Sequence, residues 1–105
     1  MRARPTALGY VDDERSGIGV QWDRAQVTRL ARRLGYELIW GPAEGSALNL
    51  VDLVHESDVD AVVIPSSLHV DALTLDRLMY TCDVETALPR ETFARYVGGR
   101  HGCPA

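Results

Sequence analysis

Lysine is missing from this 105-residue sequence, and all eleven of its basic side chains are arginine. Reactions that need a lysine amine are therefore excluded, including Schiff-base formation, phosphate binding by a P-loop lysine and receiver-type phosphorylation. Acidic side chains number fifteen, so the formal charge is −4. A protein that binds nucleic acid by itself usually carries a clear basic excess, and this sequence has none.

Cysteine and long hydrophobic runs are also scarce. Cys82 and Cys103 are the only cysteines; they do not form a disulfide framework, and we expect reduced thiols. No apolar run approaches the ~18 residues of a membrane span, and the first residues lack the apolar segment of a signal peptide. We therefore expect a cytoplasmic protein that has no membrane partner.

What the sequence does contain is the alternation of a small α/β domain. Hydrophobic residues make up 46% of the chain, enough for a core in one domain over residues 1–105. Ala61–Ile64 is an unbroken apolar run between an acidic turn and Pro65, which is typical of a strand buried on both faces. Similar signals predict further strands at residues 6–11, 36–40 and, more exposed or irregular, 83–87.

Apolar side chains at helical spacing predict four helices, at about residues 23–34, 47–55, 70–81 and 90–97. Asp23 is the expected N-cap or first-turn acid of the first helix, and Ser46 or Asn49 the cap of the second. Pro89 suits the first turn of the last helix. Residues 1–5 and 98–105 are expected to be flexible.

This alternation predicts a three-layer, mainly parallel open sheet of flavodoxin-like order 2-1-3-4. Ligands of such sheets bind at the carboxyl ends of the strands, where the strand order reverses. That point lies between the first and third strands. The side chains expected to face this crevice are Asp12, Asp13, Glu14, Ser66, Ser67 and His69.

The run Asp12–Glu14 has two interpretations. Carboxylates at a strand end offer the oxygen ligands that Mg²⁺ prefers, so a metal site is one hypothesis. A solvated acidic loop, with Arg15 as a local counter-charge, is the other.

Ser66, Ser67 and His69 are the candidate catalytic residues at the end of the third strand. A nucleophilic serine needs a base within hydrogen-bond reach and a third group that orients the base. The sequence here lacks the G-x-S-x-G elbow. Ser67 is instead predicted to cap the third helix.

A basic edge of the first helix, formed by Arg29, Arg32 and Arg33, could meet a phosphate or an acidic partner, or could simply be a solvated face. Trp22 and Trp40 are predicted to be packing residues. Exposure of either tryptophan would indicate an interface.

Three stretches, residues 7–12, 25–38 and 58–66, resemble the N-terminal catalytic domain of serine recombinases, the resolvase/invertase family. The family pattern begins Gly-Tyr-x-Arg-x-Ser, continues with a helix that ends Gly-Tyr-Glu, and then has Asp-x-Val-Val-Val-Pro-Ser. Here Gly9-Tyr10, Gly35-Tyr36-Glu37 and the run from Asp60 to Ser66 match it. The likeness covers about residues 6–88 and implies a resolvase-like fold.

The chain departs from the family at the residues that perform its reaction. Asp12 stands where the family has an arginine, and Glu14 stands where it has the nucleophilic serine. The family's Asp-Arg-Leu-x-Arg segment falls near residues 68–72, which contain no arginine. A recombinase must stabilise charge on a DNA phosphate, which carboxylates would repel.

The sequence thus predicts a resolvase-like pseudoenzyme, with no cofactor, that binds or regulates through self-association, for example as a dimer, or through a protein partner. One alternative is a Mg²⁺- or Mn²⁺-dependent enzyme that uses Asp12, Asp13 and Glu14, assisted by Ser66 or His69. A second alternative is a nucleic-acid-binding accessory protein that uses the arginines of the first helix.

Overall fold

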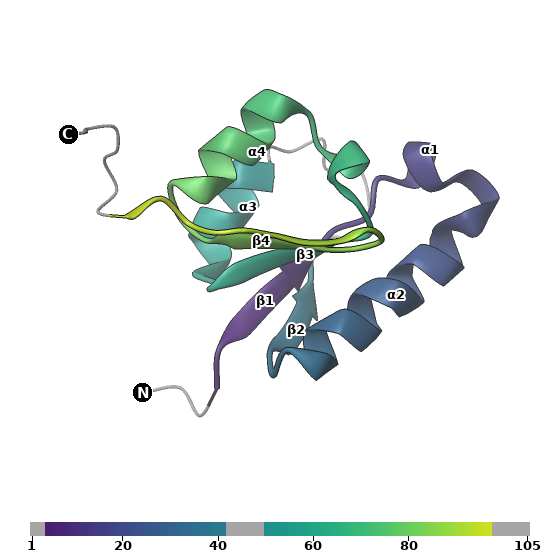
Figure 1. Ribbon diagram of the computed structural model, residues 1–105, viewed down its shortest axis with the longest axis horizontal. Helices are drawn as coiled ribbons and strands as arrows, with labels where there is room; N and C mark the ends of the chain where they lie inside the picture. The colour runs from purple at the N-terminus through teal and green to yellow at the C-terminus, as the bar shows by residue number, and fades with distance from the viewer. Residues whose placement is uncertain (1–3, 42–49, 98–105) are drawn as a thin grey trace.

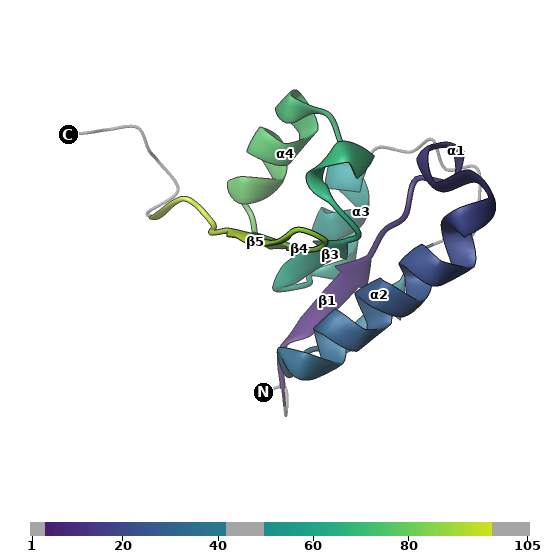
Figure 2. The same cartoon turned by 45° about the vertical axis from the view of Figure 1, so that its right-hand side comes forward.

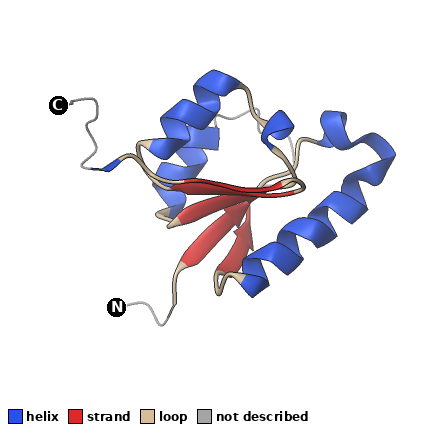
Figure 3. Ribbon diagram, viewed as in Figure 1, coloured by secondary structure: helices blue, strands red, loops and turns tan. Residues whose placement is uncertain are grey.

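The protein folds into a single five-stranded sheet that is covered by helices on both faces (Figures 1 and 3). The computed structural model describes residues 4–41 and 50–97. The strands are β1 (Thr6–Gly9), β2 (Glu37–Trp40), β3 (Ala61–Ile64), β4 (Asp83–Ala87) and β5 (Arg90–Phe93). The helices are α1 (Asp13–Ser16), α2 (Val20–Arg33), α3 (Leu50–Ser57) and α4 (Ala72–Met79), with 3₁₀ turns η1 (Gly17–Gly19) and η2 (Ser67–His69).

The sheet has the order β2-β1-β3-β4-β5. Strands β1 to β4 are parallel, which confirms the predicted α/β class and the order 2-1-3-4. β3 lies at the centre, and all four of its residues are buried, as its unbroken apolar run predicts. The carboxyl ends of β1 and β3 therefore adjoin at one edge of the sheet, named here the carboxyl-end edge.

Each face of the sheet has its own core. α2 covers one face with Val27, Leu30 and Ala31. α3 and α4 cover the other, where Val54 and Leu78 meet apolar side chains of β1, β3 and β4 (Figure 2). Among the described residues, no helix combines the length and the apolar character that a membrane crossing needs.

The last predicted helix is wrong, because residues 90–93 form strand β5, antiparallel to β4. Pro89 lies in the tight turn between the two strands and not in a first helical turn; its carbonyl accepts a 2.6 Å hydrogen bond from Thr86 Oγ1. Pairing with a neighbouring strand outweighs the helical spacing of Phe93 and Val97. β5 also pairs with the outer edge of β4, the strand that we expected to be more exposed or irregular, and Val84, Glu85 and Thr86 of β4 are buried.

Three helix starts also differ from the predictions. Residues 13–19, expected to be a loop, are helical because Asp12 caps α1: its Oδ1 accepts the Glu14 N–H at 3.1 Å. α2 begins at Val20 and not at about residue 23, which confirms Asp23 as a first-turn acid, one of its two predicted roles, and excludes it as the cap. α4 begins at Ala72 and is capped by Asp71, whose Oδ1 accepts the Thr74 N–H at 2.7 Å.

Some predictions fall outside the described residues. These are the caps Ser46 and Asn49, the start of the second helix, Cys103, residues 1–3 and the segment 98–105. Cys82 is a buried free cysteine, and burial raises the pKa of its thiol to about 12. Cys82 is therefore no nucleophile near neutral pH, because the thiolate is the reactive form.

Candidate functional site

A pocket of about 400 Å³ opens at the carboxyl-end edge, between the segment after β1 and the start of α4. β1 and β3 deliver their next residues to it, as expected for the point where the strand order reverses. Its lining combines apolar and charged side chains: Tyr10, Asp12, Arg15, Leu50, Leu68, His69, Val70, Asp71 and Thr74. A pocket thus lies where the crevice was expected, and of the six side chains expected to face it Asp12 and His69 reach the lining.

His69 is the buried polar centre of this site, with 6% of the residue exposed. Its Nδ1 accepts a 3.0 Å hydrogen bond from the backbone N–H of Asp12, 57 residues away in the chain. Because Nδ1 accepts, the neutral ring carries its proton on Nε2. Nε2 lies 3.9 Å from Asp23 Oδ2, so both ring nitrogens face groups of this chain.

Asp23 connects the histidine to the start of α2. Its Oδ2 also accepts a hydrogen bond from Ser16 Oγ at the end of α1. The contacts thus run from the Ser16 hydroxyl to the Asp23 carboxylate, then to the His69 ring and the Asp12 backbone amide. A nucleophilic triad needs the histidine next to the serine, so this arrangement fixes α1 and α2 but activates no hydroxyl. We name Asp12, Ser16, Asp23 and His69 the pocket cluster.

Burial lowers the pKa of His69, and it outweighs the attraction of the carboxylates of Asp23 and Asp12, which acts in the opposite direction. The Asp12 N–H also favours the neutral form of His69, since it donates to the neutral ring and would repel a proton on Nδ1. Beside the histidine, burial raises the pKa of Tyr10, assisted by the charges of Asp12 and Asp13. Both groups are therefore neutral near pH 7.

The three carboxylates of the acidic run, Asp12–Glu14, do not gather at one site. Asp12 caps α1 and borders the pocket, whereas Asp13 and Glu14 are exposed on α1 and do not contribute to the pocket lining. Within residues 4–41 and 50–97, no three His, Cys, Asp or Glu side chains are grouped so that they could hold a metal ion. The geometry therefore gives the metal hypothesis no support.

The two serines after β3 have local roles. Ser66 Oγ accepts the Leu68 N–H at 3.2 Å and caps η2. Ser67 is the first residue of η2, and its carbonyl accepts the Val70 N–H at 3.3 Å. The prediction that Ser67 caps the third helix is wrong, because Asp71 has that role. Neither serine belongs to the pocket lining.

The predicted basic edge lies far from the pocket. Arg32 and Arg33 are in the last turn of α2, at the opposite end of the sheet, and Arg29 is exposed one turn earlier. The two tryptophans behave differently from each other. Trp40 packs under the guanidinium of Arg24, 4.1 Å from its ring centre, and touches Gly9 so closely that a Cβ there would lie 2.8 Å from the indole. Trp22 is 56% exposed, so the packing prediction fails for it.

Sequence reasoning missed a group of exposed apolar side chains at the carboxyl-end edge. Four large apolar side chains are exposed on the helical segments at this end of the sheet: Ile18 in η1, Trp22 in the first turn of α2, Leu68 in η2 and Leu73 in the first turn of α4. Of these four, Leu68 also lines the pocket. We name these four residues the apolar rim. One signal for it was available, since Trp22 lies outside the helical stripe of Val27, Leu30 and Ala31.

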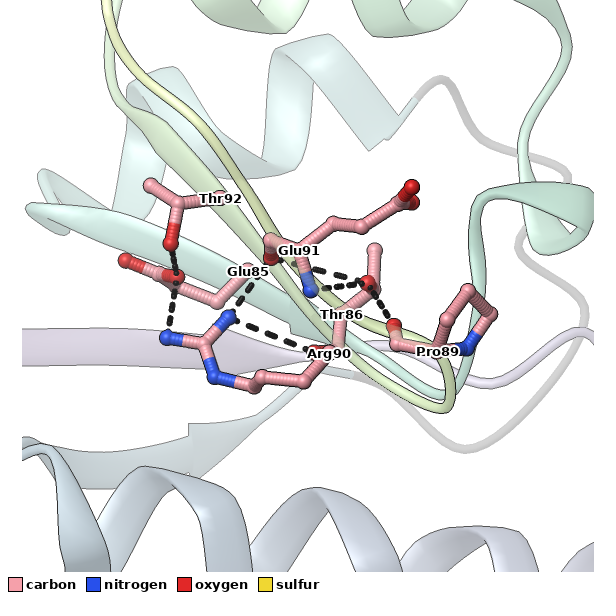
Figure 4. A network of polar contacts seen from close by, with 6 residues as sticks. All are labelled: Glu85, Thr86, Pro89, Arg90, Glu91 and Thr92. Atoms are coloured by element: carbon pink, nitrogen blue, oxygen red, sulfur yellow. Dashed lines mark hydrogen bonds and ion pairs between the residues drawn. The ribbon is translucent and has the colours of Figure 1, made fainter.

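A second polar cluster lies in the β4–β5 hairpin and was also missed (Figure 4). Glu85 is buried, yet its Oε1 accepts 2.9 Å and 2.5 Å contacts from the Arg90 guanidinium and the Thr92 hydroxyl. Thr86 Oγ1 bridges the turn by donating to Pro89 O and accepting the Glu91 N–H at 3.1 Å. We name these six residues the hairpin cluster: Glu85, Thr86, Pro89, Arg90, Glu91 and Thr92.

Comparison with known proteins gives no relative: no family model, no curated protein and no solved structure matches the chain.

Proposed function

We propose that this chain is a non-catalytic domain of resolvase-like architecture that acts by binding another polypeptide at its carboxyl-end edge. The polypeptide is a second copy of the chain or a protein partner. The apolar rim at this edge carries the proposal, because large apolar side chains grouped at one edge of a domain mark an interaction site.

The polar groups of the pocket support a binding role over a catalytic one. Asp12 and Glu14 stand where the resemblance to serine recombinases requires an arginine and the nucleophile. The nitrogens of His69 face the Asp12 amide and the Asp23 carboxylate, so no base is presented to a serine. These groups hold the edge in shape, and none of them is arranged to transfer a phosphoryl group.

The distribution of exposed apolar residues supports this particular edge. Ile18 is fully exposed, and Leu68 and Leu73 are 66% and 60% exposed. At the opposite end of the sheet Leu34, Tyr80 and Val97 are exposed, and the Tyr80 ring packs edge-on against Tyr96, with 4.8 Å between ring centres. The carboxyl-end edge therefore has the larger group of apolar side chains in need of a cover.

Site-specific photo-cross-linking tests the proposal. A benzophenone amino acid replaces Ile18 in one variant and Leu34, at the far end of α2, in a matched control. In cells of the source organism, we expect position 18 to cross-link to polypeptide, either this chain or another, and position 34 to give little. Light scattering of the purified chain over a wide concentration range identifies self-association. Equal or absent cross-linking at the two positions would refute the proposal.

The two alternatives from the sequence receive less support. The acidic run does not gather into a metal site among the described residues. The arginine edge of α2 lies at the end remote from the pocket and has few exposed apolar neighbours. DNA cleavage or joining by the purified chain would contradict the proposed lack of catalysis.

A further inference from the structure

We propose that the carboxyl-end edge binds a cationic amphipathic segment of a partner protein, and that an arginine or lysine side chain of this segment enters the pocket. This inference rests on the proposed protein-binding function and adds the chemistry of the partner. Three observations carry it: the apolar rim, the sign of the charge around it, and the mixed lining of the pocket.

The apolar rim sets the kind of surface that the partner must present. Ile18 lies in η1, which joins α1 to α2, and Trp22 lies in the first turn of α2. Leu68 and Leu73 extend from η2 and from the first turn of α4, on the α4 side of the pocket. Figure 2 shows α1 and the segment leading into α4 at the same end of the molecule. A helix with an apolar face can contact both sides, in the manner of helix-in-groove recognition.

The charge around the rim sets the sign of the partner. Among the described residues, the carboxylates of Asp12, Asp13, Glu14, Asp23 and Asp71 lie at this edge. They outnumber the guanidinium groups of Arg15 and of Arg24, which lies over Trp40 at the end of β2, while Arg90 at the same end is paired with Glu85. Hydrogen bonds from Thr74 lower the pKa of Asp71, which keeps that carboxylate charged. An acidic edge with apolar side chains attracts a segment that is basic on one face and apolar on another.

The pocket explains why one cationic side chain should enter it. Leu50, Leu68 and Val70 give the lining an apolar part, and the carboxylates of Asp12 and Asp71 give it an anionic part. Arginine and lysine match this combination, because their aliphatic stems lie along apolar surface while the charged group reaches a carboxylate. At about 400 Å³, the pocket holds such a side chain with room for bridging water.

A second copy of this chain fits less well than a separate partner. Its exposed basic helix face, with Arg29, Arg32 and Arg33, has charge of the right sign. The large apolar side chain exposed beside these arginines is Leu34, at 36%. A second copy would thus supply cations but no apolar face. Anionic lipid headgroups and nucleic-acid phosphates carry the wrong charge for this edge.

The test measures binding of fluorescent peptides to the full chain by anisotropy. The probe is a peptide of about 14 residues, built from Leu and Lys with one apolar face. A Leu/Glu peptide of the same pattern tests charge, and a Leu/Lys peptide of scrambled order tests the apolar face. We expect the amphipathic Leu/Lys peptide to bind at least about tenfold more tightly than either control peptide. Raising the salt from about 0.05 M to about 1 M should weaken this binding.

Matched variants then locate the site. Ile18→Ser and Leu68→Ser should each weaken binding of the Leu/Lys peptide by about tenfold, whereas Leu34→Ser at the far end of α2 should leave it unchanged. Asp71→Asn removes a pocket charge but retains an N-cap, so the fold persists while binding falls by about threefold. Glu56→Gln, at the other end of the sheet, is the control for charge.

Several outcomes would overturn the inference. One is equal binding of the Leu/Lys and Leu/Glu peptides; another is no binding of any peptide; a third is Leu/Lys binding that the edge variants do not change. Concentration-dependent dimerisation that Ile18→Ser abolishes would show that a second copy occupies the edge instead. If position 18 still cross-links to polypeptide in cells, the binding function stands and only the cationic partner is wrong.

Discussion

The hairpin cluster and the pocket cluster each surround a buried polar side chain, Glu85 and His69 respectively, but they are built differently. In the hairpin, a charged pair joins residues close in sequence: Glu85 and Arg90 lie on paired strands, with their charged atoms 2.9 Å apart. In the pocket, a neutral ring joins residues far apart in sequence, since His69, after β3, accepts a hydrogen bond from the backbone amide of Asp12, after β1. The hairpin arginine is partly exposed, whereas the histidine is almost fully buried.

This difference separates a structural element from a surface prepared for binding. The hairpin contacts cover the edge of β4 and satisfy one another, with Arg90 also donating to the Glu91 carbonyl at 2.6 Å. The pocket contacts hold α1 and η2 in fixed positions and leave apolar side chains around them exposed. Damage to the hairpin cluster should therefore reduce stability alone, while damage to the pocket cluster should affect stability and binding together.

The largest effect is expected from Arg90→Ala in the hairpin. The substitution leaves the buried Glu85 carboxylate without its cation. Since 37% of the Arg90 side chain is exposed, we expect a loss of about 2 kcal/mol, below the 3–5 kcal/mol typical of a fully buried pair. Urea denaturation measures it. Adding Glu85→Gln to Arg90→Ala should recover much of the lost stability. Binding of the Leu/Lys peptide should stay unchanged in the single and in the double variant.

In the pocket cluster, His69→Leu should cost about 1–2 kcal/mol, because the Asp12 N–H loses its acceptor. His69→Asn places an amide oxygen near the position of Nδ1 and should recover part of this stability. The affinity for the Leu/Lys peptide should follow the same order, with the His69→Leu variant binding more weakly than the His69→Asn variant. If His69→Leu lowers stability but leaves peptide binding intact, the proposed division between the two clusters is wrong.

A smaller effect is expected from Thr92→Val in the hairpin, which removes the 2.5 Å hydrogen bond to Glu85 but keeps a β-branched side chain in the strand. The expected loss is about 1 kcal/mol, since Arg90 still neutralises the carboxylate. Thr28→Val in α2 is the control, because it removes a hydroxyl that only donates to the Arg24 carbonyl of its own helix. A loss no greater than that of the control would show that Thr92 is dispensable.

The smallest effect concerns pH. Folding lowers the pKa of His69 below its ordinary value of 6.5, because burial disfavours the charged ring. Between the two pKa values the unfolded chain binds more protons, so the contribution of His69 to stability is complete above pH 6.5 and declines as the pH falls below it. Urea midpoints of the wild type and of His69→Asn between pH 8 and pH 5, roughly the range in which histidine titrates, isolate this contribution. A difference that does not change with pH would contradict it.

Local patterns were sufficient for the parallel part of the fold. The apolar run Ala61–Ile64 identified a central strand, and the stripe of Val27, Leu30 and Ala31 identified the helix over it. Helix ends were predicted less well, since Asp12, Asp23 and Asp71 are all plausible caps and only the backbone path selects between them. Residues 90–97 have helical spacing, but a strand partner was available, and its hydrogen bonds outweighed the periodicity.

For the candidate site, the sequence located the switch point but not the roles of its residues. It placed Asp12 and His69 at one crevice, which is correct. It did not show that His69 accepts a hydrogen bond from a backbone amide, because that contact depends on the path of α1. The exposure of Trp22 was also missed, since an aromatic residue at the start of a helix can pack inward or outward.

The sequence by itself determined that the protein is a mostly parallel α/β domain without lysine chemistry, because strand and helix periodicity and composition are local properties. Tertiary structure decided which groups meet: that the histidine is neutral and enclosed, that the acidic run forms no metal site among the described residues, and that four apolar side chains are exposed at the same end of the sheet. Such meetings depend on distances between residues far apart in the chain, which periodicity does not encode.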